Sequence, residues 1–200
     1  MVILELPFGS GYIWQLKIPP KIRIFKWKAC VDALPTMLNL RKRGVNTDGL
    51  CPVCGLEAES IFHALFNCSV VKETWNLWKE CPIDIGVETL DFADVALKLL
   101  DAGTPRDMEV LVVVAWANWH NRNLRVFESI SQGAEQVWNF AASMLADYKE
   151  VAKFCSLGLA SCEVSWKKPP ARVFKINTNG ATVDDGRQSS IGVIIRDCMG

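Results

Sequence analysis

The sequence predicts an α+β fold that is mainly helical, with a β-hairpin near the C-terminus. Through most of the first 156 residues, apolar side chains recur at steps of three and four, which is the period of a helix packed on one side. From Arg172 onward they alternate with polar residues, which is the period of a half-buried strand. Half of all residues are apolar and 22% are charged, a composition typical of a folded globular chain.

The first predicted helix covers residues 21–33. Pro20 is suited to the first position of a helix, because a proline has no N–H to leave unpaired there. Ile22 and Phe25 lie on the apolar face that follows, so we expect this helix to be largely buried with its basic residues at the edges. Pro35 ends the helix, since proline cannot continue the hydrogen-bond ladder.

Further helices follow from the same signals. Thr36 is a candidate N-cap and Gly44 a candidate stop for a short helix over residues 37–43. The apolar pattern then predicts helices over residues 59–66, 71–79, 88–101, 107–128 and 134–154. In the helix at 71–79, Trp75 and Trp78 lie about one turn apart, and we expect both indoles to pack over the cysteine and histidine cluster at residues 51–68 and over the first helix.

The C-terminal part changes character after a predicted linker at residues 156–170. Residues 172–181 and 191–196 alternate between apolar and polar side chains, and Asp185-Gly186 between them is a turn signal. We therefore predict a β-hairpin within residues 171–200.

Three cysteines and one histidine stand at the spacing of a zinc site, Cys51-x2-Cys54-x8-His63-x4-Cys68. Three thiolates and one imidazole form a closed tetrahedral ligand set, which leaves no open position for catalysis. The turn residues around the cysteine pair place both thiols on a tight turn, and His63 is predicted to project from the helix at 59–66. The alternative is a group of buried cysteines near a core histidine. We predict a structural Zn²⁺ at these four residues.

The other cysteines favour a reducing compartment. The N-terminus shows no pattern of a secretory signal peptide, so we expect a nuclear or cytoplasmic protein, in which metal binding is favoured over disulfides. No apolar run reaches the ~18–20 residues of a membrane span, so we expect no membrane partner. Most of the cysteines outside the zinc pattern are expected to be small buried residues; these cysteines are Cys30, Cys81, Cys155, Cys162 and Cys198.

Charge is distributed unevenly although the net charge is zero. Residues 1–43 hold eight basic and two acidic residues, whereas the rest of the chain holds 14 basic and 20 acidic ones. Such asymmetry is typical of a segment that meets a polyanion, although a solvated helix face would give the same count. The candidate nucleic-acid contacts are Lys21, Arg23, Lys26, Lys28, Arg41, Lys42 and Arg43.

Several of these blocks together resemble the zinc-binding module of reverse transcriptases in plant non-LTR (LINE-type) retrotransposons. The blocks are Tyr12-Ile-Trp14, Lys21-Ile-Arg-Ile-Phe-Lys-Trp-Lys-Ala29, Leu34-Pro-Thr36, Arg43-Gly44-Val45, Cys51-x-x-Cys54 and Glu59-x-x-x-His63. The resemblance covers roughly residues 10–82. Trp116-x-x-Trp119-x-x-Arg122 resembles a helix of the connector at 83–156 that follows in these proteins. Lys175-Ile-Asn-Thr-Asn179-Gly-Ala181 resembles the first strand of a ribonuclease-H-like domain, truncated here to residues 171–200 after a linker at 157–170.

The resemblance implies a nucleic-acid-binding, retrotransposon-derived chain without catalysis, with RNA or DNA bound independently of sequence and a polymerase or another protein as a further partner. An Asp occupies the position of Asn179 in active ribonuclease-H-like domains, where it helps to hold divalent metals; an amide oxygen is a poorer ligand for Mg²⁺. The alternatives are ribonuclease H activity on RNA–DNA hybrids in a longer chain, and a zinc-dependent protein-interaction module.

Residues of the connector helix also have two interpretations. Trp116 and Trp119 could stack on bases, but we expect them to pack in the core. Arg122 could reach a phosphate or pair with acidic neighbours. His120 has no partner at metal-ligand spacing, so we expect an ordinary surface or core residue.

Overall fold

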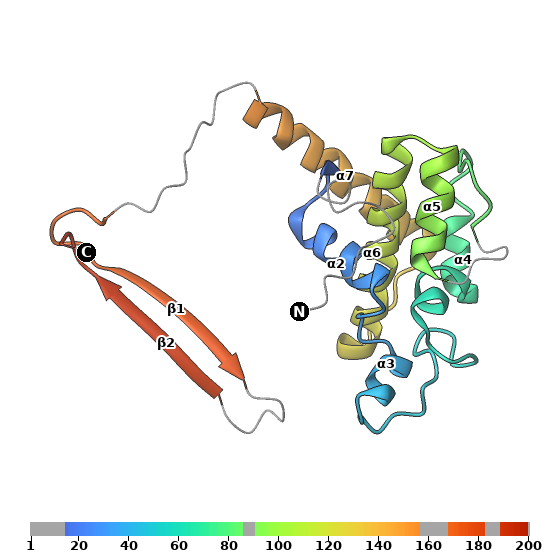
Figure 1. The fold of residues 1–200 in the computed structure, drawn as a ribbon, viewed down its shortest axis with the longest axis horizontal. Coiled ribbons are helices and arrows are strands. Elements are labelled where there is room, and N and C mark those ends of the chain that lie inside the picture. Colours follow the sequence, from blue (N-terminus) through green and yellow to red (C-terminus); the bar gives the residue numbers. More distant parts are fainter. Residues whose placement is uncertain (1–14, 86–90, 157–167, 183–188, 200) are drawn as a thin grey trace. The chain divides into compact units, whose positions relative to one another are not determined.

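The computed structural model describes residues 15–85, 91–156, 168–182 and 189–199. Its contacts divide the chain into two units, residues 1–159 and residues 160–200. The described part of the first unit is helical and that of the second is a hairpin (Figure 1). The predicted α+β class, mainly helical with a C-terminal hairpin, is confirmed. No described helix combines the length and apolar character needed to cross a bilayer.

The first unit begins with helices whose starts the sequence predicts. Pro20 is the first residue of the first of them, and the Thr36 hydroxyl accepts the N–H of Asn39 at 3.2 Å at the start of the next. The first helix ends three residues earlier than predicted, because Asp32 already has a left-handed backbone with φ 50°. The elements in order are α2 (Pro20–Cys30), α3 (Met37–Lys42), the π-helix η1 (His63–Asn67), α4 (Ser69–Trp75), α5 (Phe92–Ala102), α6 (Pro105–Glu128) and α7 (Ala134–Ser156).

Helix α6 is central to this unit. It begins in a capping box, in which the Thr104 N–H donates to the Asp107 carboxylate at 2.8 Å and the Asp107 N–H donates to the Thr104 hydroxyl at 3.3 Å. Such reciprocal bonds satisfy N–H groups that a helix start leaves unpaired. The helix packs against α2, η1, α5 and α7.

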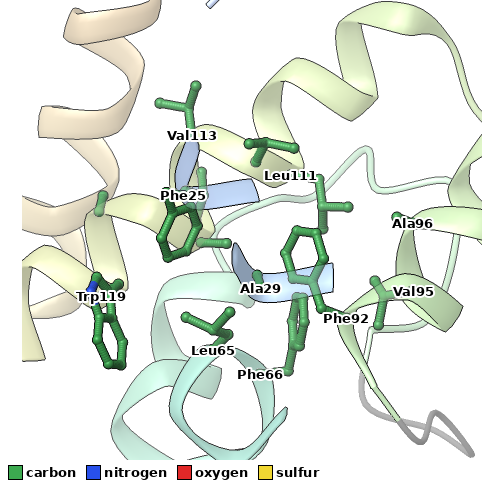
Figure 2. Close-up of a cluster of buried hydrophobic side chains, with 14 of the residues drawn as sticks. Phe25, Ala29, Leu65, Phe66, Phe92, Val95, Ala96, Leu111, Val113 and Trp119 are labelled. Atoms are coloured by element: carbon green, nitrogen blue, oxygen red, sulfur yellow. The ribbon is translucent and has the colours of Figure 1, made fainter. Parts of the chain in front are cut away.

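One hydrophobic core joins the zinc segment to the helices that follow it (Figure 2). Phe25 from α2, Phe66 from η1, Phe92 from α5 and Leu111 from α6 lie together in it, and the Phe66 ring centroid is 5.7 Å from that of Phe92. The predicted segments 10–82 and 83–156 therefore contribute to a shared core within one compact unit.

The second unit contains the strands β1 (Lys175–Thr182) and β2 (Ser189–Arg196), paired antiparallel. Ile176 faces Ile195 and Asn179 faces Gly192 in the register. β1 begins three residues later than predicted, and Arg172 before it has a left-handed φ of 65°. The predicted turn at residues 185–186 and most of the predicted linker lie outside the described residues.

Candidate metal centre

A tight turn positions the first two cysteines. The Gly55 N–H donates to the Cys51 carbonyl at 2.8 Å, and the Cys51 N–H donates to the Glu57 carbonyl at 2.8 Å. Gly55 has a left-handed φ of 69°, which glycine adopts without the steric cost that a side chain brings. The predicted turn is present, and it brings the Cys51 and Cys54 thiols to the same place.

A π-helical turn positions the other two ligands. His63 begins η1 and Cys68 follows its last residue, and the Cys68 N–H donates to the His63 carbonyl at 2.9 Å. The sequence predicted a helix over residues 59–66, and His63 lies on a helical segment. From His63 to Asn67 this segment is a wider π turn, and single π turns of this kind are frequent at functional sites. Cys68 lies just beyond the helical segment, as predicted.

The four ligand atoms converge to the dimensions of a zinc site. The Cys51, Cys54 and Cys68 sulfurs and a His63 ring nitrogen all lie within 4.8 Å of one another. The Cys51 and Cys68 sulfurs are 4.0 Å apart, and His63 Nε2 is 3.4 Å from the Cys54 sulfur. A tetrahedral Zn²⁺ with ordinary bond lengths requires about 3.8 Å between two sulfurs and about 3.5 Å between sulfur and nitrogen. The donor set and its spacing fit Zn²⁺.

Hydrogen bonds among the ligands and their burial shift the pKa values of three of them. The hydrogen bond between Cys51 and Cys68, together with burial, raises the pKa of Cys51 to about 12, whereas the same bond lowers the pKa of Cys68 to about 7 against the effect of burial. A hydrogen bond with Cys51 raises the pKa of His63 to about 9, although burial opposes it. Zinc requires thiolates and a neutral imidazole, so its binding displaces protons from these groups.

Glu57 orients the histidine ligand, a role that the sequence analysis missed. Its carboxylate accepts the His63 Nδ1–H at 3.1 Å, which leaves Nε2 facing the Cys54 sulfur. Carboxylates that accept the second ring N–H of a metal-binding histidine fix its tautomer and raise its basicity. The sequence contained only a weak signal for this role, namely an acidic residue in the turn between two ligands.

Removal of this carboxylate is expected to weaken zinc binding without destroying the site. Glu57→Ala should lower the affinity about 10- to 100-fold, the usual effect of losing such a partner. Competition against a chromophoric chelator measures it. Glu73→Ala, which removes an exposed carboxylate on α4, is the matched control and should leave the affinity unchanged; an equal effect of the two variants would contradict the role of Glu57.

A buried ion pair connects the zinc segment to α6. Arg122 donates from Nε to Glu59 Oε1 at 2.8 Å and from Nη2 to Glu59 Oε2 at 2.7 Å. The Glu59 side chain is 0% exposed and that of Arg122 is 4% exposed. The Met37 N–H also donates to Glu59 Oε2, at 2.7 Å. Of the two interpretations of Arg122, the structure shows pairing with an acidic residue, but with one that is 63 positions away.

The candidate nucleic-acid contacts lie in different environments. Lys21, Lys28 and Arg41 are exposed, and Lys42 and Arg43 are exposed at the end of α3. Lys42 pairs with Asp32 at 3.1 Å. Arg23 is half-buried, and its guanidinium donates to the Ile18 carbonyl at 3.2 Å and to the Tyr148 hydroxyl at 3.3 Å.

Lys26 is a correction to this set. The residue is 1% exposed and lies on the inner side of α2 with Ile22 and Phe25. Burial lowers the pKa of its ammonium group from 10.5 to about 8. A side chain in this position is closed off from an external phosphate, so we remove Lys26 from the candidate contacts. Its place in the apolar period of α2 was the signal that could have excluded it.

The cysteines outside the cluster differ from the expectation of burial. Cys30 and Cys81 are half-buried and Cys198 is exposed. Cys155 and Cys162 lie where side chains are not described.

Comparison with known proteins supports the same interpretation. Residues 7–75 match the family described as zinc-binding in reverse transcriptase. A protein of Arabidopsis thaliana named "Putative ribonuclease H protein" is 21% identical over 209 residues, which cover 94% of this chain and 32% of that protein. The chain thus spans about a third of the length of this relative. No solved structure matches.

These matches confirm the resemblance to the zinc-binding module of reverse transcriptases. The chain contains a reverse-transcriptase-type zinc-binding domain, and Zn²⁺ is its cofactor. The similarity to a protein named for ribonuclease H extends beyond the zinc-binding segment, in line with a ribonuclease-H-like C-terminal part.

Proposed function

We propose that this retrotransposon-derived chain binds nucleic acid through its zinc-stabilised unit, independently of sequence, and that it has no catalytic activity of its own. The observation that carries the proposal is a group of exposed cations on two short helices next to the zinc segment. They are Lys21, Lys28, Arg41, Lys42 and Arg43. The match to a zinc-binding family of reverse transcriptases supports a polyanionic partner.

The metal centre supports this role by fixing the backbone around the cations. Zinc would hold the turn at Cys51 and the π turn at His63 as one rigid body. The Glu59 carboxylate binds the first N–H of α3 through Met37, so the basic end of that helix is anchored to the zinc segment. Cations at the last turn of a helix also stabilise the helix dipole, which is a second reason for their position.

Binding is expected to fall steeply with salt. If about four cations meet phosphates, the logarithm of the association constant should fall with the logarithm of the salt concentration at a slope of about −3 to −4. Fluorescence anisotropy of a labelled oligonucleotide with the zinc-loaded 200-residue chain measures this slope at several salt concentrations.

Charge variants locate the contact. Changing Arg41, Lys42 and Arg43 together to alanine should weaken binding and flatten the slope, whereas changing Lys72 and Lys79, which are exposed on and after α4, should do neither. A slope near zero, or full binding after the triple change, would favour the protein-interaction alternative. Mg²⁺-dependent cleavage of an RNA–DNA hybrid would instead favour the ribonuclease alternative and overturn the proposed lack of catalysis.

A further inference from the structure

We propose that the nucleic acid is bound as a single strand whose bases stack on an aromatic and basic surface formed by α2, α6 and α7. The inference rests on the proposed nucleic-acid binding and names the form of the ligand. The residues of this aromatic–basic surface are Lys21, Trp27, Lys28, Trp116, His120 and Phe140.

Helix α2 supplies the exposed indole and two cations. Its inner side is formed by Ile22, Phe25, Lys26 and Ala29. At about 100° per residue, Lys21 and Lys28 lie close together on one flank of α2, and Trp27 lies roughly 100–120° further round, on the side opposite the inner residues. The Trp27 indole is 42% exposed, whereas tryptophan side chains are highly buried on average. The exposed part of α2 thus offers a flat aromatic ring beside a flank that carries two ammonium groups.

Helices α6 and α7 supply a packed group of three rings. Trp116 and His120 stack with ring centroids 5.3 Å apart and planes 2° from parallel. Phe140 packs against both, at 5.6 Å from His120 and 6.0 Å from Trp116, and remains 38% exposed. Trp119, by contrast, is buried in the core (Figure 2). We expected core packing of both Trp116 and Trp119, and Trp116 is only partly buried.

Lys21 connects the two halves of the surface. Its ammonium nitrogen lies 4.6 Å from the centroid of the Trp116 ring, a distance at which a cation is attracted to an aromatic face. α2 also packs against α6. The ring group on α6 and α7 therefore adjoins the flank of α2 that carries Lys21 and Lys28.

Charge and shape together favour a single strand over other ligands. α2 carries four basic residues and no acidic one, and within the described residues neither Lys21 nor Lys28 forms an ion pair with a carboxylate. Cations of this kind meet phosphates, while exposed rings meet the faces of unpaired bases. A duplex keeps its base faces stacked inside, so it would use only the cations. Because every base has a flat face, binding should tolerate any sequence.

The test compares single strands with a duplex on the full zinc-loaded chain. The probes are labelled oligouridylate and oligodeoxythymidylate of about 12 nucleotides, within the usual range of single-strand sites, and a DNA duplex of the same length. Both single strands should bind at least about fivefold more tightly than the duplex at equal salt. Trp27→Ala should weaken single-strand binding at least about fivefold, the loss typical of one stacked base, and leave duplex binding unchanged.

Two variants keep the result interpretable. Trp27→Phe retains a ring and should retain most of the single-strand affinity. Phe127→Ala removes an aromatic side chain that is 79% exposed near the end of α6, outside the aromatic–basic surface, and should have no effect. Lys28→Ala should reduce the salt slope for single strands by about 0.7, the value for one lost phosphate contact.

The outcomes separate this inference from the proposed function. Binding to none of the probes would overturn both. Duplex binding equal to single-strand binding, or a Trp27→Ala effect no larger than that of Phe127→Ala, would overturn the stacking surface alone and leave charge-driven binding in place.

Discussion

Changing Cys51 to serine is expected to abolish zinc binding and to unfold the segment between Gly49 and about Trp78. The Cys51 sulfur is buried and belongs both to the metal cluster and to the hydrophobic core. Structural zinc contributes about 10–16 kcal/mol of apparent binding energy to small modules, which equals or exceeds the ~5–15 kcal/mol that usually separates folded from unfolded domains. The loss of one thiolate ligand should therefore release the metal and the local fold together.

Elemental analysis and amide hydrogen exchange measure these two effects. The variant should contain no zinc, and amide protection should be lost in the zinc segment first, since all four metal ligands lie within it. Cys198→Ser is the control, because Cys198 is exposed in the second unit and outside the cluster. Retention of one zinc and of native exchange by Cys51→Ser would refute the assigned ligand set.

Changing Arg122 to alanine should destabilise the first unit by about 3–5 kcal/mol, the cost of breaking a buried ion pair by removing one partner. Among the described residues, the Glu59 carboxylate would keep only the Met37 N–H as a donor while remaining 0% exposed. Arg122 also lies 4.8 Å over the Trp119 ring, and this packing would be lost as well. Urea unfolding of the zinc-loaded chain, followed by tryptophan fluorescence, measures the change.

A nearby arginine provides the matched control. Arg125 lies less than one turn further along α6, is exposed, and bonds only to the Ser131 hydroxyl at 3.3 Å among the described side chains. Arg125→Ala should change stability by no more than about 0.5 kcal/mol. The double change Glu59→Leu with Arg122→Met should recover much of the loss, because it removes the unpaired buried charge. If Arg122→Ala matched Arg125→Ala, the ion pair would have no structural role.

The zinc ligands were predictable because their signal is local. Cys51 and Cys54 are separated by two residues on a turn that Gly55 makes possible. Zinc imposes a tetrahedral geometry on cysteine and histidine ligands at this spacing. The starts of α2 and α3 were predictable for the same reason. Pro20 has no N–H that the helix start would leave unpaired, and the Thr36 hydroxyl accepts an N–H three residues further along.

Features that depend on the fold could not be predicted in this way. Glu59 and Arg122 are 63 positions apart, and neither periodicity nor spacing connects them. No local sequence signal at His63 favours a π turn over an α-helix. The π turn follows instead from the need to bring His63 and Cys68 to one metal ion. Lys26 looked like its exposed neighbours because a charged residue is rarely found buried, although its place in the apolar period with Ile22 and Phe25 distinguishes it.

X-ray absorption at the zinc edge of the purified 200-residue chain tests the central claim most directly. With Cys51, Cys54, His63 and Cys68 as ligands, the spectrum should show one zinc per chain surrounded by three sulfurs at about 2.3 Å and one nitrogen at about 2.0–2.1 Å. A shell made mainly of oxygen and nitrogen, or a chain that folds natively with no zinc bound, would contradict the account.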